Sequence, residues 1–220
     1  MKKVLSTLLA ASMMLLGTQA FAQVSVGAGY LNSTKSYENV DPVNNNGVYA
    51  GLSFNIPIAG GFAVAPGVYY SMIAGKKDIV SGKIANVDTK FAEHALNIPV
   101  YFNWGMNLAP DMRFFVFAGP TCQYGLASKT TVEVGSSALS DLLSSLGLSG
   151  KAEGKQEIDN YKNDNYNRFN VYVGGGVGMD IANAFQVTVG YDYGVTNLYK
   201  GDNAPKSHRS NVKLGVAYLF

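Results

Sequence analysis

The sequence predicts an all-β fold: an eight-stranded antiparallel up-and-down β-barrel that crosses a membrane. Three observations predict it, namely eight segments of alternating apolar residues, connections that alternate between short and long, and an apolar segment that closes the chain on Phe220. A period of two places the apolar side chains on one face of a strand. We expect that face to meet lipid, with Phe220 in an aromatic girdle at one membrane interface.

Most of the eight segments approach the roughly 9–11 residues that a tilted membrane strand requires. They are Val24 to Leu31, Val48 to Ile56, Phe62 to Met72, Glu93 to Trp104, Arg113 to Tyr124, Arg168 to Ile181, Phe185 to Val195 and Asn211 to Phe220. In the fifth segment both faces begin apolar, and we assign Phe114 and every second residue to Tyr124 to the outward face. This choice keeps charge off the outward face throughout, as expected because a lipid-facing Lys or Arg near the midplane costs about 2–4 kcal/mol.

The connections are short after the second, fourth and sixth segments and long after the others. Outer-membrane barrels have this pattern, with short periplasmic turns and long extracellular loops. In the third long loop, between Ser136 and Gly150, four leucines recur at helical spacing. We therefore expect a short amphipathic helix in that loop.

A soluble barrel of the lipocalin type, with apolar residues inside, is the alternative fold. The second face of the segments decides between them. Its charged residues are Glu93, Arg113, Arg168, Asp180, Asp192 and Lys213. They occupy about one position in seven, whereas a water-exposed surface carries roughly 25–35% charge. The remaining residues are mostly small or uncharged, which suits the narrow interior of eight strands.

Residues 1–22 have the pattern of a cleaved secretory signal peptide. Lys2 and Lys3 precede the apolar run Val4 to Leu16, and Ala20-Phe21-Ala22 forms a cleavage site before Gln23. Removing both lysines leaves 15 basic and 15 acidic residues of the original 17 and 15. A neutral mature chain gives no reason to expect nucleic-acid binding. Residues 23–220 are then one barrel domain, exported to the outer membrane of a Gram-negative bacterium.

Several short motifs resemble those of small outer-membrane β-barrel families. They are Leu96-Asn97-Ile98-Pro99-Val100, Gly119-Pro120, Gly174-Gly175-Gly176 and the terminal alternation with Tyr218 and Phe220. The chain resembles OmpA/OmpX-type barrels and, more closely, the porin-family barrels of Bacteroidetes-type bacteria. The resemblance implies contact with outer-membrane lipid or lipopolysaccharide, and recognition of Tyr218 and Phe220 by the assembly machinery. The resemblance indicates the fold and the location but does not indicate which activity the protein has. We expect a monomer without a cofactor.

Charged residues on the inward face form the first candidate site. Arg168, Asp180, Asp192 and Lys213 lie on the last three segments. Opposite charges in a narrow lumen are expected to pair, because an unpaired buried charge is costly. We expect a polar network that fills the lumen, with a gated ion path as the alternative. An eight-stranded barrel is too narrow for an open aqueous channel.

His208 and Ser210 form the second candidate site. This His-x-Ser pattern resembles that of the lipid A deacylases, which are also eight-stranded barrels. A Ser activated by a His needs an orienting acid, and none follows Ser210 in the sequence. We therefore expect both to be loop residues. His94 is expected at the barrel rim, and two His with one Cys predict no metal site.

The function expected from these patterns is that of an outer-membrane barrel with a structural or surface-interaction role. Its long loops would provide the binding surface, and no catalytic activity is expected. Three alternatives remain open: a lipid-modifying hydrolase that uses Ser210 and His208, a narrow pore, and a soluble ligand carrier.

Overall fold

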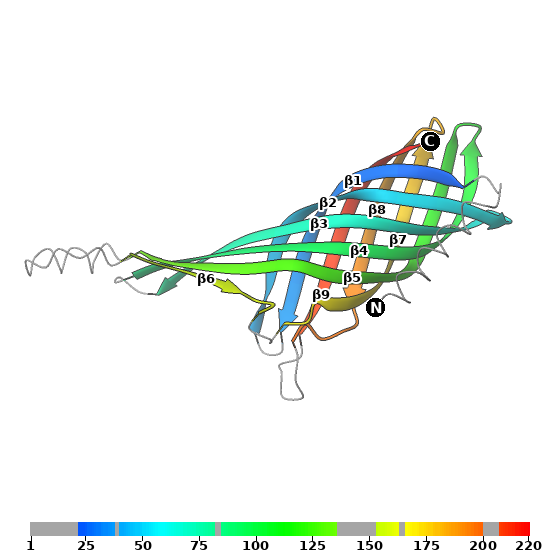
Figure 1. Ribbon diagram of the computed structural model, residues 1–220. Helices are drawn as coiled ribbons and strands as arrows, with labels where there is room; N and C mark the ends of the chain where they lie inside the picture. Colours follow the sequence, from blue (N-terminus) through cyan, green and yellow to red (C-terminus); the bar gives the residue numbers. More distant parts are fainter. Residues whose placement is uncertain (1–21, 38–39, 82–84, 136–152, 163–165, 200–206) are drawn as a thin grey trace, which may run out of the picture.

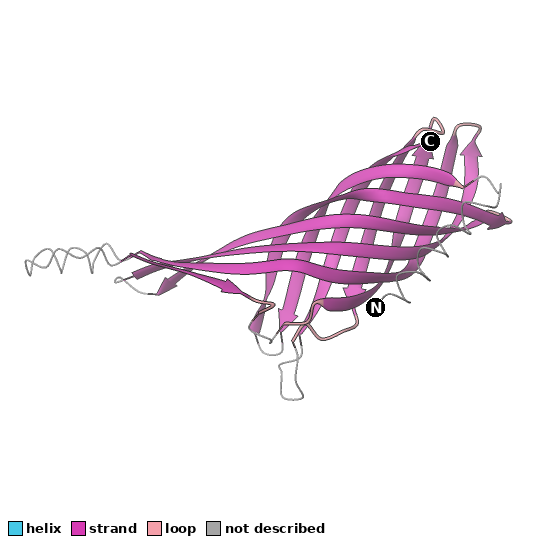
Figure 2. Cartoon of the chain, viewed as in Figure 1, coloured by secondary structure: helices cyan, strands magenta, loops and turns pink. Residues whose placement is uncertain are grey.

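The computed structural model describes residues 22–37, 40–81, 85–135, 153–162, 166–199 and 207–220. The expected signal sequence up to residue 21 and the expected helix between Ser136 and Gly150 lie outside these ranges. Everything described is strand, turn or loop (Figure 2). No helix within these ranges is long and apolar enough to cross a membrane.

Nine antiparallel strands make up the described structure (Figure 1). They are β1 (Gln23–Tyr37), β2 (Val40–Ala59), β3 (Phe62–Ser81), β4 (Ala85–Ala109), β5 (Met112–Gly135), β6 (Glu153–Asp159), β7 (Phe169–Ile181), β8 (Phe185–Gly194) and β9 (Ser207–Leu219). Eight of them close a ring in the order β1–β2–β3–β4–β5–β7–β8–β9, because β9 pairs with β1. The predicted eight-stranded barrel is confirmed, and β6 is an additional strand outside the ring.

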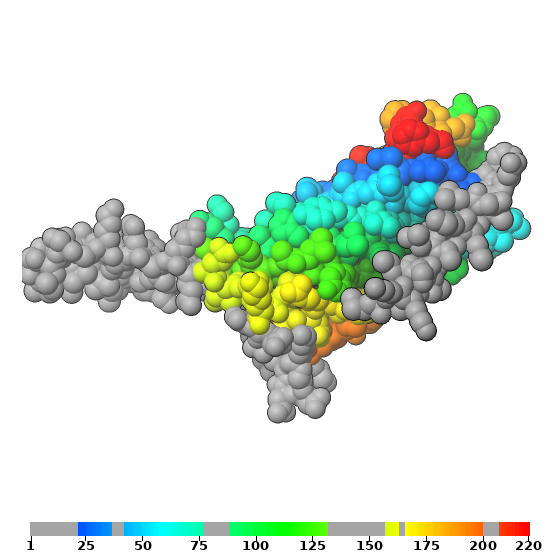
Figure 3. All heavy atoms as spheres, in the orientation of Figure 1, coloured from blue at the N-terminus to red at the C-terminus, as the bar shows by residue number. Residues whose placement is uncertain are grey.

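Four strands are much longer than the sequence predicted, namely β2, with 20 residues, and the three strands that continue together beyond the ring. β3, β4 and β5 have 20, 25 and 24 residues, about twice the roughly 9–11 needed to span a membrane. Beyond the ring they continue as a four-stranded sheet with β6, which pairs with the last residues of β5. We call residues 75–81, 85–92, 129–135 and 153–159 the sheet extension (Figures 1 and 3). The sequence pattern predicts loops for these residues, and that prediction is wrong.

Apolar side chains cover the outside of the ring, and polar ones face its interior. On β9, Val212, Leu214 and Val216 are at least half exposed. On β5, Phe115 is buried whereas its neighbour Val116 is exposed, so the assignment of the fifth segment is confirmed. A soluble barrel requires the opposite arrangement, and that alternative is wrong.

Aromatic residues mark both edges of the apolar band. Near the short turns lie Phe54, Phe62, Trp104, Phe185, Tyr218 and Phe220, all exposed. At the other edge lie Tyr30, Tyr70, Tyr124, Tyr191 and Tyr193, also exposed. Tyrosines keep an apolar ring in lipid while the hydroxyl reaches polar neighbours. The hydroxyl groups of Tyr30 and Tyr191 do so, because they donate to Asn46 and Ser210 at 2.6 and 2.9 Å.

Glycines make room for the aromatic rings inside the ring of strands. The run Gly174-Gly175-Gly176 places its first and third members on the inward face of β7. A Cβ atom built at Gly176 would lie 2.7 Å from the Phe117 ring, closer than real contacts allow. One built at Gly190 on β8 would lie 3.1 Å from the same ring. Large side chains on β5 therefore pack against small residues on β7 and β8.

Cys122 provides a direct test of the lipid-facing surface. It is exposed on the outward face of β5, between the two aromatic edges. We expect a nitroxide attached to Cys122, in protein reconstituted into vesicles, to collide with oxygen much more often than with a water-soluble nickel complex. The control is a nitroxide at Ser36→Cys in a Cys122→Ser background, at a position beyond the apolar band. This nitroxide should collide more often with the nickel complex than with oxygen. Equal ratios at both positions would contradict the orientation.

Candidate functional site

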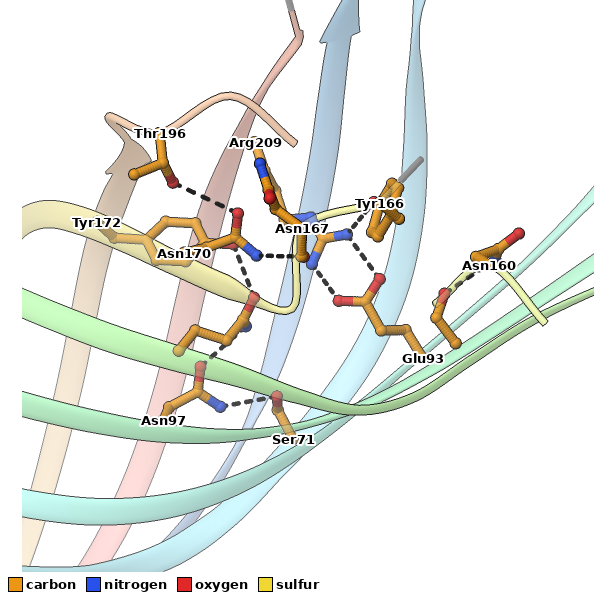
Figure 4. A network of polar contacts seen from close by, with 12 residues as sticks. Ser71, Glu93, Asn97, Asn160, Tyr166, Asn167, Asn170, Tyr172, Thr196 and Arg209 are labelled. Carbon is orange, nitrogen blue, oxygen red and sulfur yellow. Dashed lines mark hydrogen bonds and ion pairs between the residues drawn. The ribbon is translucent and has the colours of Figure 1, made fainter. Parts of the chain in front are cut away.

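An ion pair crosses the lumen between opposite walls of the barrel. Arg209 lies on β9 and Glu93 on β4, four strands apart in either direction around the ring. The guanidinium Nη1 pairs with Oε1 of Glu93, and Nη2 donates to Oε2 at 2.7 Å. Both side chains are only 1% exposed. The bidentate geometry fixes both groups, as Figure 4 shows.

A cluster of aromatic residues covers this ion pair. The hydroxyl of Tyr166 accepts a hydrogen bond from Arg209 Nη2 at 2.9 Å. Tyr166 packs with Tyr161 and Leu198, and all three are buried. Burial raises the pKa of the Tyr161 hydroxyl, so this group remains neutral. The ammonium of Lys35 lies 3.6 Å from the centre of the Phe91 ring. Together these residues cover the end of the lumen that faces the sheet extension.

A row of hydrogen bonds crosses four strands at this level (Figure 4). Tyr172 on β7 donates to Gln123 on β5 at 3.0 Å. Gln123 donates to Asn97 on β4 at 2.9 Å, and Asn97 donates to Ser71 on β3 at 2.8 Å. Each amide uses its oxygen as acceptor and its nitrogen as donor, so the row fixes the orientation of both amides.

A cavity of about 120 Å³ lies on the barrel side of this row. Asp192 and Lys213 form an ion pair in its wall, and the hydroxyl of Tyr101 lies 3.3 Å from each of them. Toward the short turns, Arg113 pairs with Asp180 at 3.1 Å. Among the described residues, the lumen therefore carries ion pairs at three levels.

The four charged residues predicted to form one lumen network do not do so. Asp192 and Lys213 pair with each other, but Asp180 pairs with Arg113 on β5. Arg168 precedes β7, and its guanidinium lies 4.8 Å from the centre of the Tyr161 ring. Arg168 and Asp180 do not meet because Arg168 comes directly before the start of β7 whereas Asp180 lies near its end.

Arg209 is a lumen residue that the sequence pattern places in the loop before the last segment, and that prediction is wrong. The alternation that begins at Asn211 in fact extends back to Ser207, so that Ser207, Arg209 and Asn211 all face inward. Extending the alternation of the last segment by two residues toward the N-terminus identifies Arg209 as an inward-facing residue.

His208 and Ser210 lie on the outward face of β9 and not in a loop. The Nδ1 atom of His208 is 3.0 Å from the carbonyl oxygen of Gly194, and the ring stacks on Tyr193. Ser210 Oγ accepts its hydrogen bond from Tyr191. Asp192 is buried in the lumen, and the described contacts of His208 include no carboxylate. His94 faces outward as well, in contact with the Tyr70 hydroxyl.

The described residues contain no group of three or more His, Cys, Asp or Glu that could hold a metal ion. At the opposite end of the barrel, the Phe220 amide donates to the Val24 carbonyl at 2.8 Å. The rings of Tyr218 and Phe220 are in edge-to-face contact, 4.9 Å apart, and both are exposed. Their recognition by the assembly machinery stays a prediction.

Comparison with known proteins identifies the class. A sequence profile described as outer membrane protein beta-barrel domain matches residues 17–200. The chain belongs to this family and is an outer-membrane β-barrel protein. The short turns are therefore periplasmic, and the sheet extension and Tyr166 are extracellular.

Three solved structures of outer-membrane proteins are similar to the chain at low sequence identity. Ail of Yersinia pestis is 12% identical, with 90% of this chain and 99% of Ail covered and a TM-score of 0.41. Neisserial surface protein A is 12% identical, with 90% and 97% covered and a TM-score of 0.47. The outer membrane enzyme PagL is 13% identical, with 89% and 98% covered and a TM-score of 0.43. No curated protein matches the sequence.

Proposed function

We propose that the protein is a membrane-anchored surface-interaction protein without catalytic activity, and that the sheet extension is its binding surface. One observation carries the proposal: Glu93, Arg209 and Tyr166 cover the extracellular end of the lumen, while β3 to β6 continue past it. A covered lumen offers little surface to a large partner. The sheet extension, by contrast, presents paired strands outside the membrane.

A trimmed variant tests this proposal. The Asn160 amide donates to the Ser128 carbonyl at 2.9 Å, so an Asn-Gly turn can replace residues 129–159. Ala74 and Ala92 are cross-strand partners on β3 and β4, so a second Asn-Gly turn can replace residues 75–91. We expect the barrel of this variant to fold. Cells that display it should lose adhesion to a panel of immobilised extracellular proteins and polysaccharides. Asn183→Ala in a periplasmic turn is the control. Equal adhesion by trimmed and full-length protein would contradict the proposal.

The narrow pore is a competing function that conductance measurements address. Three levels of ion pairs and the row from Tyr172 to Ser71 place bonded side chains across the lumen, on either side of its cavity. We expect planar bilayers that contain the purified protein to show no unitary conductance steps. Reproducible steps that vanish when the protein is unfolded would support the pore instead.

A lipid-modifying hydrolase is the second candidate, and one observation favours it. His208 and Ser210 share the outward face at the extracellular edge of the apolar band, where lipid headgroups lie. Gly194 O can only accept, so this contact favours the neutral tautomer with its proton on Nδ1, which leaves the lone pair of Nε2 to face a proton donor. The test is lipid A hydrolysis by the purified protein and by Ser210→Ala. The same background rate for both would exclude this function.

A further inference from the structure

An uncharged patch of amide and hydroxyl groups lies on the outward face of β1 and β2. Its members are Tyr30, Asn32, Thr34, Asn44 and Asn46, which we call the amide patch. It begins where the apolar band ends, because Tyr30 pairs with Val48, and the next outward pairs are Asn32 with Asn46 and Thr34 with Asn44. The patch therefore rises directly from the hydrocarbon edge of the outer leaflet.

Internal hydrogen bonds fix how the amides of the patch are oriented. Asn46 Oδ1 accepts from the hydroxyl of Tyr30 at 2.6 Å and from Asn32 Nδ2 at 2.9 Å. Asn44 Oδ1 accepts from the hydroxyl of Thr34 at 2.6 Å. Each asparagine has two donors on nitrogen and an acceptor oxygen. With both oxygens engaged, the NH₂ groups of Asn44 and Asn46 remain to bond a neighbour, beside the free oxygen of Asn32.

The position of the patch determines what lies against it. A strand rises about 3.3 Å per residue, so with the strand tilt Asn32 and Thr34 lie roughly 5 and 10 Å beyond Tyr30. The polar layer on each side of a bilayer core is about 5–8 Å thick. The groups that touch Tyr30, Asn32 and Asn46 are therefore the headgroups of outer-leaflet lipids, and Thr34 and Asn44 lie at the outer end of that layer.

The charge of the patch determines which headgroup chemistry it fits. A phosphate is bound best by Arg or Lys, but the cations at this level of β1 and β9, Lys35 and Arg209, are buried in the lumen. The exposed lysines Lys76, Lys90 and Lys129 lie on β3, β4 and β5 instead. Neutral donors next to a neutral acceptor match hydroxyl groups, which both donate and accept. Fixed polar groups of this kind lose little entropy when they bind.

We infer that the amide patch binds the uncharged sugar units of a glycolipid headgroup in the outer leaflet. Asn44 and Asn46 donate to sugar hydroxyl oxygens, and Asn32 accepts from a sugar hydroxyl. The inference concerns the lipid that surrounds the barrel and is independent of the role proposed for the sheet extension.

Lipid selection by the reconstituted protein tests the inference. The probe is a nanodisc with equal amounts of digalactosyl diacylglycerol and phosphatidylcholine of identical acyl chains, and the lipids retained by the protein are counted by native mass spectrometry. Two or three added hydrogen bonds predict about fivefold to tenfold enrichment of the glycolipid. No enrichment by the wild-type protein would overturn the inference, as would a stronger preference for phosphatidylglycerol when it replaces the glycolipid.

A double variant separates this contact from general barrel–lipid contacts. Asn44→Asp with Asn46→Asp keeps the oxygens that bind Thr34, Tyr30 and Asn32, but it removes the outward NH₂ donors. We expect the enrichment to fall to parity while the barrel remains folded. Asn107→Asp at the periplasmic end is the matched control and should retain the wild-type enrichment. Undiminished enrichment in the double variant would overturn the inference.

Discussion

Replacing Arg209 by alanine will destabilise the barrel by about 3–5 kcal/mol, because the substitution leaves Glu93 charged and unpaired in a buried site. Both side chains are 1% exposed, so water cannot take over the lost contacts. The substitution also removes the donor to Tyr166. Urea unfolding in lipid vesicles, followed by the electrophoretic shift between folded and unfolded forms, measures the effect.

A second variant distinguishes the charge effect from lost packing. Glu93→Leu combined with Arg209→Met replaces the pair by apolar side chains, and we expect it to recover most of the stability. Lys129→Ala breaks the exposed pair with Glu157 and should leave the unfolding midpoint unchanged. A loss below about 1 kcal/mol for Arg209→Ala, within the range of exposed pairs, would show that the crossing ion pair is not a main support of the lumen.

Replacing Val216 by arginine will cost about 2–4 kcal/mol, because the new charge enters the middle of the lipid-facing band. Val216 is 61% exposed and lies on β9, midway in the sequence between Val212 and Phe220. In a water-soluble barrel the same substitution at an exposed position would be nearly neutral. The same vesicle unfolding assay measures the difference.

Ser36→Arg is the matched control for this substitution. Ser36 also faces outward, on the neighbouring strand β1, but it lies past the amide patch and outside the apolar band. We expect the unfolding free energy of the Ser36→Arg variant to stay within about 0.5 kcal/mol of that of the wild type. Similar losses at Ser36 and Val216 would mean that depth in the membrane does not determine the cost.

The sequence predicts the barrel well because lipid imposes a strong pattern on it. From Val212 to Phe220 every second residue is apolar, since each one faces hydrocarbon while its neighbour faces the lumen. Past Met72 on β3 the alternation of apolar and polar residues is lost from the sequence, while the hydrogen-bonded ladder continues to Ser81. The pattern marks where the membrane ends and cannot mark where the strand ends.

The lumen contacts were predictable only where they are local. Asp192 and Lys213 lie on the adjacent strands β8 and β9, so opposite charges on the same face suggest their pairing. Glu93 and Arg209 are separated by 116 residues and meet only because the ring closes with a particular stagger. Alternation carries no information about that stagger, and Arg209 lay two residues beyond the recognised segment.

The continuity of β3, β4 and β5 has a mechanical consequence. These strands run without a break from the periplasmic turns into the sheet extension. Tension applied to the end of the sheet extension would act along the strands, so it would load many backbone hydrogen bonds in shear at the same time and would not break them one after another. A protein built in this way resists extraction under flow better than one whose attachment point hangs on an unpaired linker.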